Sequence, residues 1–76
     1  MILAVTENAE LVRHLEEEFA AKGDRVASAS SSSVGLARLL LDGPDLVVCD
    51  TAVGGWDKIA RVAATRSIQV RVVREA

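Results

Sequence analysis

Short apolar runs alternate along the chain with stretches in which apolar residues recur every three or four positions. A short unbroken apolar run bounded by polar residues is typical of a buried strand, whereas the spaced pattern is typical of an amphipathic helix. The sequence therefore predicts strands and helices in strict alternation, beginning and ending with a strand. The expected strands cover residues 2–5, 24–29, 45–50 and 68–73.

The first helix is expected at residues 9–22, where Leu11, Leu15 and Phe19 recur every four positions. Asn8 precedes this pattern as an N-cap, and a glycine follows it as a stop signal. Both end signals agree with the periodic segment, which makes this helix the best defined of the three.

The second helix is expected after the serine run Ser30–Ser33, which we interpret as a loop that ends in an N-cap. It ends at the Gly43-Pro44 pair, because proline cannot continue a helix. Its apolar residues at helical spacing are Val34, Ala37, Leu40 and Leu41. The third helix follows the Gly54-Gly55 turn, and its apolar residues are Trp56, Ile59, Ala60, Val62 and Ala63.

The segment 45–50 gives the clearest strand, because its middle residues, Leu46 to Cys49, are all apolar. That pattern is typical of a strand covered on both faces of a parallel sheet. Strands that alternate with helices also imply right-handed crossovers and a parallel sheet. We therefore expect a single α/β domain over residues 1–76.

The last expected strand has a different pattern. Gln69 and Arg71 share one face of it, and Val70 and Val72 share the other. A parallel strand covered on both faces should be apolar throughout, so an arginine in its middle predicts a face or an edge open to water. Charges on an edge strand also discourage unwanted pairing.

Composition narrows the functional classes. The chain has 76 residues, half of them apolar, and a formal net charge of −2 without a basic stripe, so we expect no nucleic-acid partner. No apolar run approaches the ~18 residues of a membrane span, so we expect no membrane contact and a cytoplasmic location. A domain of this size buries only about 60% of the surface of its unfolded chain, so a partner or a second copy would help it fold.

Two residues that often carry chemistry are expected to be structural here. Cys49 is the single cysteine, and its place in an apolar strand favours a small buried side chain over a redox thiol. His14 lies between two leucines of the first helix and is expected at the surface rather than in phosphotransfer.

Three segments carry a family resemblance: residues 2–8 (ILAVTEN), 43–50 (GPDLVVCD) and 53–57 (VGGWD). Together they resemble the receiver domain of bacterial response regulators. Residues 2–8 (ILAVTEN) are similar to the first receiver strand and its acidic end. Residues 43–50 (GPDLVVCD) are similar to the strand that carries the phosphorylated aspartate, and residues 53–57 (VGGWD) to the loop that follows it. The resemblance implies a shortened flavodoxin-like, three-layer fold with strand order 2-1-3-4, in which the chain covers only the earlier part of a receiver.

The resemblance makes Asp50 the candidate phospho-acceptor. Its carboxylate would attack a phosphoryl group, and a divalent ion would neutralise the charge that develops. The implied Mg²⁺ ligands are Glu7, Asp50 and the backbone carbonyl of Ala52, while Thr6 stands where the family has a first acid. A carboxylate pair this small binds Mg²⁺ weakly, because the ion wants several oxygen ligands.

Two further positions depart from the receiver pattern. Arg74 falls at the position of the family's switch serine or threonine, and the conserved lysine of the fifth strand has no counterpart before Ala76. We therefore expect weak phosphorylation or none. Arg71 and Arg74 become the candidates for an interaction edge on the last strand.

Two functions from different classes remain open. The first is an atypical receiver that is not an enzyme and acts as a protein-interaction or dimerisation module, either as a homodimer through the last strand or by docking a partner near Arg71. The alternative is a receiver that accepts phosphate at Asp50 from a histidine kinase or a small phosphodonor. The chain could also be the first piece of a longer polypeptide. Nothing in the sequence points to a hydrolase, a nucleotide-binding enzyme or a DNA-binding domain.

Overall fold

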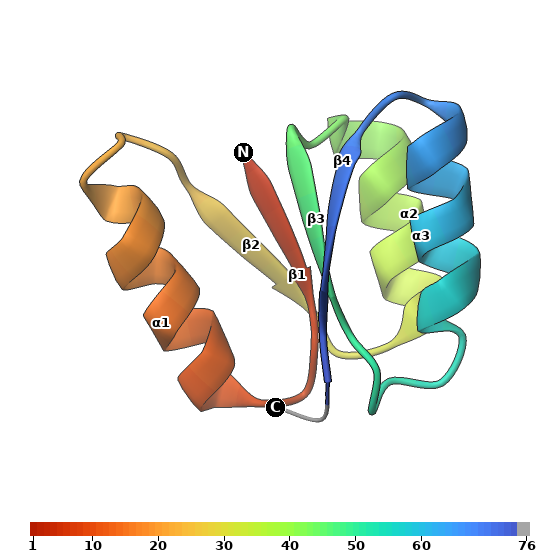
Figure 1. Ribbon diagram of the computed structural model, residues 1–76, viewed down its shortest axis with the longest axis horizontal. Coiled ribbons are helices and arrows are strands. Elements are labelled where there is room, and N and C mark those ends of the chain that lie inside the picture. The colour runs from red at the N-terminus through yellow and green to blue at the C-terminus, as the bar shows by residue number, and fades with distance from the viewer. Residues whose placement is uncertain (75–76) are drawn as a thin grey trace.

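The computed structural model describes residues 1–74 as a parallel four-stranded sheet with helices on both faces (Figure 1). The strand order is β2-β1-β3-β4, which confirms the predicted α/β class and the predicted order. The elements are β1 (Ile2–Val5), α1 (Ala9–Ala20), β2 (Val26–Ala29), α2 (Ser32–Asp42), β3 (Leu46–Asp50), α3 (Trp56–Thr65) and β4 (Gln69–Val73).

The helices divide unequally between the faces of the sheet. Figure 1 shows α1 alone on one face and α2 and α3 side by side on the other. Because successive side chains of a strand point to opposite faces, each strand contributes to both layers. The larger cluster, on the α2 and α3 side, buries Leu3, Val5, Ala29, Leu39, Val47, Cys49, Val53, Ile59 and Ala63. The smaller cluster, on the α1 side, buries Ile2, Ala4, Leu15, Phe19 and Val48.

The ends of α1 follow the signals in the sequence. The side chain of Asn8 accepts hydrogen bonds from the backbone N–H groups of Glu10 and Leu11, as expected of an N-cap. At the other end Gly23 has a φ of 73°, and the N–H of Asp24 donates to the carbonyl of Phe19 over 3.1 Å. This is the Schellman motif, in which a left-handed glycine ends the helix. The regular helix therefore stops before the predicted residue 22.

The serine run is only partly a loop. Ser31 is the N-cap, and its hydroxyl accepts a hydrogen bond from the N–H of Val34 over 3.3 Å. The helix α2 therefore begins at Ser32, and the predicted loop is wrong for Ser32 and Ser33. The run contains the N-cap as expected, but the cap lies near its middle.

The helix α2 was predicted from apolar residues that turn out to be mostly exposed. Leu41 is 85% exposed, and Val34 and Leu40 are about half exposed. The buried residues of α2 are Gly35 and Leu39. A Cβ added at Gly35 would lie 2.9 Å from Cδ1 of Ile59, so the absence of a side chain there lets the helix approach its neighbours. A glycine contributes nothing to an apolar pattern, which is why the pattern did not identify the packed face.

Candidate functional site

Asp50 lies at the carboxyl end of β3 and is only 2% exposed. The register pairs Val5 with Cys49, so the next step along both strands places Thr6 beside Asp50. Thr6 is 3% exposed, and by strand alternation both side chains lie on the α1 side of the sheet. The carboxyl ends of parallel strands are where open α/β sheets place their sites.

The carboxylate of Asp50 is held by donors on both of its oxygens. The hydroxyl of Thr6 donates to Oδ2 over 2.7 Å, and the backbone N–H of Ala52 donates to Oδ1 over 2.9 Å. The oxygen of Thr6 in turn accepts a hydrogen bond from the N–H of Asn8 over 3.0 Å. A buried carboxylate needs such partners, because losing water without compensation costs several kcal/mol. The arrangement is a satisfied polar pair at the end of the core.

Glu7 follows Thr6 in the chain and lines the same hollow as Thr6. Its residue is exposed and lines a hollow of about 420 Å³ beside the carboxyl ends of β1 and β2, to which Asp50 does not contribute. Of the predicted ligands, Asp50 and Ala52 are in contact through the backbone N–H of Ala52, and the hydroxyl of Thr6 donates to the same carboxylate.

These donors fit Mg²⁺ poorly. The ion prefers an octahedral set of oxygen ligands rich in charge, whereas Thr6 supplies a neutral hydroxyl that already bonds to Asp50. Both oxygens of Asp50 also accept hydrogen bonds from within the chain. A metal bound at Asp50 would share the carboxylate oxygens with these protein donors.

The two predicted interaction residues, Arg71 within β4 and Arg74 just after it, make different contacts. Arg71 makes a bidentate pair with Glu18 of α1, with both nitrogen–oxygen distances at 3.1 Å. Its guanidinium also lies 5.6 Å from the centre of the Phe19 ring. The hydrogen bond from Arg71 lowers the pKa of the Glu18 carboxyl from its ordinary value. Arg71 therefore covers part of the α1 face while its charge is matched within the chain.

Arg74 lies directly after the last residue of β4, beside the site. Together with Thr51, Trp56 and Val72 it lines a hollow of about 650 Å³ on the α3 side. The N–H of Thr51 donates to the carbonyl of Val73 over 2.9 Å, which fixes the loop after Asp50 against the end of β4. Arg74, which the resemblance aligns with the receiver's switch hydroxyl, is one of the residues that line this hollow.

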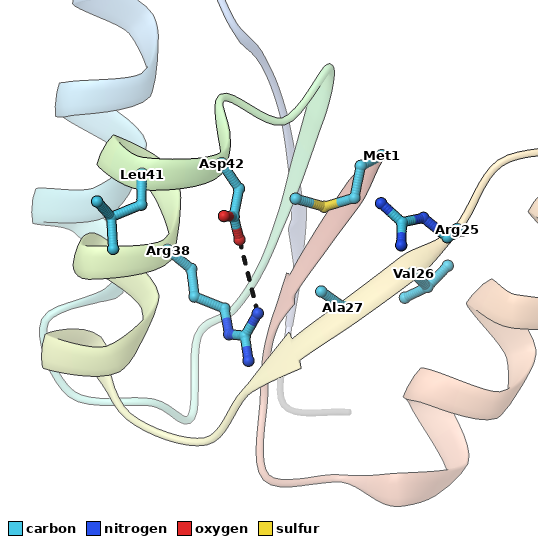
Figure 2. A pocket seen from close by; sticks show the side chains of 7 residues that line it. All are labelled: Met1, Arg25, Val26, Ala27, Arg38, Leu41 and Asp42. Atoms are coloured by element: carbon cyan, nitrogen blue, oxygen red, sulfur yellow. Dashed lines mark ion pairs between the residues drawn. The ribbon is translucent and has the colours of Figure 1, made fainter.

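A third hollow, of about 550 Å³, opens between α2 and β2 (Figure 2). It is lined by Met1, Arg25, Val26, Ala27, Arg38, Leu41 and Asp42. Figure 2 shows Arg38 reaching across it, with a nitrogen 3.5 Å from a carboxylate oxygen of Asp42. The hollow adjoins neither Asp50 nor Thr6, so it is separate from the site that the sequence predicted.

The amino end of the sheet carries an ion-pair cluster. The terminal ammonium of Met1 lies 2.6 Å from Oδ2 of Asp45 and 3.4 Å from Oδ1 of Asp24. The hydrogen bond to Asp45 raises the pKa of the ammonium and lowers the pKa of the Asp45 carboxyl. These contacts link the starts of β1, β2 and β3 and contribute no group to the site.

Cys49 and His14 lie where the sequence indicated. Cys49 is fully buried in the larger cluster, and burial raises the pKa of its thiol to about 11, so a thiolate is disfavoured. His14 is exposed on α1. Both observations agree with structural rather than chemical roles for these residues.

Sequence reasoning missed two partners. It noted Thr6 only as a missing acid, although a parallel register that aligns the ends of β1 and β3 could have placed its hydroxyl beside Asp50. It gave no role to Glu18, whose pairing with Arg71 spans 53 positions of the chain. No local pattern signals such a contact.

Comparison of the chain with protein-family models, with curated proteins and with solved structures gave no match. Within residues 1–74, no helix has the length and apolar character needed to cross a membrane. The sequence and the geometry described above are therefore what supports a function.

Proposed function

We propose that this chain is an atypical receiver-like domain of a signalling protein, which acts as a protein-interaction module with weak or no phosphorylation. Its order of elements and the place of Asp50 at the carboxyl end of β3 support the receiver relationship. We place it in the cytoplasm, where response regulators act. The partner in this role is another protein or a second copy of the chain.

One observation supports the proposed loss of phosphorylation chemistry. The hydroxyl of Thr6 donates to Oδ2 of Asp50 over 2.7 Å in a position where receivers have a metal-binding acid. An acid there would add a ligand for Mg²⁺, whereas the hydroxyl supplies a neutral donor to one of the two carboxylate oxygens of Asp50. With Asp50 2% exposed and bonded on both oxygens, its role is to close the end of the core.

The test is incubation with acetyl phosphate and MgCl₂, read by intact mass spectrometry. We expect the chain to keep its mass, because the phosphoryl group is neither attacked efficiently nor neutralised by a bound metal. The Thr6→Asp variant returns an acid to the position and should gain phosphoryl mass if the substitution is what removed the chemistry. Asp50→Asn in the Thr6→Asp background is the matched control and should gain none.

The same experiment can overturn the proposal. A near-stoichiometric gain by the unaltered chain that disappears in Asp50→Asn would make it a phosphate-accepting receiver, with a histidine kinase as the expected donor. In that reaction a carboxylate oxygen of Asp50 forms the bond to phosphorus while the bond from phosphorus to the donor's leaving group breaks.

A further inference from the structure

The open edge of β4 presents backbone groups in an order that a second copy can match. Within residues 1–74 β4 is an outer strand, paired with β3 on one side only. The N–H of Thr51 donates to the carbonyl of Val73, so Val73 points its backbone groups at β3. In a parallel ladder alternate residues point to the same neighbour, so Arg71 and Gln69 also face β3. The backbone groups of Val70 and Val72 therefore face outward.

We propose that two copies of the chain pair antiparallel through β4, with Val70 of each copy opposite Val72 of the other. This inference rests on the proposed interaction function and names its partner. In this register each Val70 and Val72 exchanges N–H and C=O bonds with its opposite residue, as a hydrogen-bonded antiparallel pair does. Arg71 of both copies then lies on the two-fold axis, and the two sheets become one.

Neighbouring registers fit less well. A shift that pairs Val70 with its own copy places Ile68 opposite Val72, but the N–H of Ile68 already donates to the carbonyl of Ala63 over 2.9 Å. A shift that pairs Val72 with its own copy places Val70 opposite Arg74, which lies beyond the last residue of β4. Only the central register uses residues of β4 alone with free donors.

The side chains agree with this register. Val72 is 47% exposed on the α3 side, and in the dimer it would contact Val70 of the second copy. Cross-strand pairs of β-branched residues stabilise antiparallel pairing. On the opposite side the two Arg71 side chains come close, but each is already matched by its own Glu18. The pairing thus brings together two ion pairs rather than two unmatched charges.

The first test is sedimentation of the 76-residue chain over a range of concentrations. We expect a monomer–dimer equilibrium that Val72→Pro weakens by about tenfold or more, because each copy loses one donor to its partner. Proline at this position removes an N–H that faces away from β3, and such edge positions tolerate it. Circular dichroism and urea unfolding of the variant show whether its sheet is retained.

Ser28→Pro is the matched control on the other edge. The bonds from Ile2 to the carbonyl of Arg25 and from Thr6 to that of Ala29 leave Ser28 of β2 facing outward in the same way. We expect this variant to dimerise like the unaltered chain. Equal weakening by both substitutions, or a chain that stays monomeric at the highest concentration reached, overturns the inference.

The second test reads the register and does not depend on the proline variant folding. Arg71→Cys places one thiol from each copy as a directly opposed, non-hydrogen-bonded pair, whose Cα separation of about 4.5 Å suits a disulfide. Gln69→Cys is the matched control, because position 69 lies opposite 73 rather than itself. The native thiol of Cys49 is buried, so we expect it not to react.

We expect mild oxidation to link Arg71→Cys into a disulfide dimer at least tenfold faster than Gln69→Cys. Equal rates indicate random collision and overturn the register. These results are interpreted independently of the phosphorylation assay. If the chain is monomeric and takes no phosphate, the homodimer is ruled out, and the proposed interaction role requires a different partner. If the chain dimerises and is also phosphorylated, the proposed function is contradicted and the proposed β4 pairing is supported.

Discussion

The two faces of the sheet differ in the number of apolar residues that they bury and in the polar contacts that they hold. Within residues 1–74, the face under α2 and α3 buries nine apolar residues in one cluster, and the face under α1 buries five. The α1 face also holds the polar groups of interest: the Thr6–Asp50 bond at the strand ends and the Glu18–Arg71 pair across β4. A sheet covered by fewer helices on one face leaves room there for polar groups. In this chain the larger apolar core lies on one face, and the polar contacts of Asp50 and Arg71 lie on the other.

The largest expected effect separates the two faces by one matched substitution. Leu39→Ala on α2 and Leu15→Ala on α1 each remove the same atoms from a buried position, at 0% and 3% exposure. Such changes cost about 2–5 kcal/mol, depending on how far the surroundings can relax into the space. We expect the cost at Leu39 to be near the top of this range and that at Leu15 near the bottom, as measured by urea unfolding.

The reason for this difference is the second helix on the α2 and α3 face. Leu39 lies in a cluster enclosed by the sheet and two helices, where neighbours cannot move inward freely. Leu15 lies under a single helix that can shift toward the sheet. Equal losses at both positions would mean that the α1 face is packed as firmly as the other, and the division between the faces would then be wrong.

A smaller effect is expected from the polar pair on the α1 face. Thr6→Val keeps the shape of the side chain but removes the hydroxyl that donates to Asp50, leaving a buried carboxylate with one protein donor fewer. We expect a loss of about 1–3 kcal/mol in the free energy of unfolding, the usual cost of an unsatisfied buried polar group. Thr6→Ser retains the hydroxyl and should lose much less. If Thr6→Val proves neutral, water reaches Asp50, and the site is more open than its 2% exposure indicates.

The sequence predicted some features of the fold better than others. The order of elements and the burial of Cys49 followed from alternating apolar runs, because parallel strands covered on both faces leave that pattern. The strand order followed from the resemblance to receiver domains. The buried face of α2 did not follow from the pattern, because it depends on Gly35. The lack of a side chain at Gly35 leaves space for Ile59.

The candidate site was predictable in place and less so in contacts. A family resemblance located Asp50, and strand direction placed it at the carboxyl edge. The hydrogen bond from Thr6 depends on the register between β1 and β3, which the sequence does not state. The Glu18–Arg71 pair depends on how α1 crosses the sheet toward β4, and an exposed glutamate among its neighbours gives no sign of its partner.

The smallest expected effect concerns the Glu18–Arg71 pair and its dependence on pH. Arg71 holds the pKa of Glu18 below its ordinary value of 4.5, so the folded state favours the ionised carboxylate. The resulting stability is fully present above pH 4.5 and is lost as the pH falls through the lowered pKa of the folded state. We expect Glu18→Gln to lower the urea midpoint at pH 7 and to differ progressively less from the unaltered chain as the solution is acidified.

The control for this prediction is Glu17→Gln, which removes the same charge from an exposed neighbour on α1. It should leave the acid dependence of the urea midpoint close to that of the unaltered chain, because it leaves the Glu18–Arg71 pair in place. The pair is half exposed, so added salt should shrink the effect of Glu18→Gln at pH 7. A difference that persists unchanged below pH 4 would instead assign the role of Glu18 to packing against Phe19, and the α1 face would then be held by apolar contact rather than by charge.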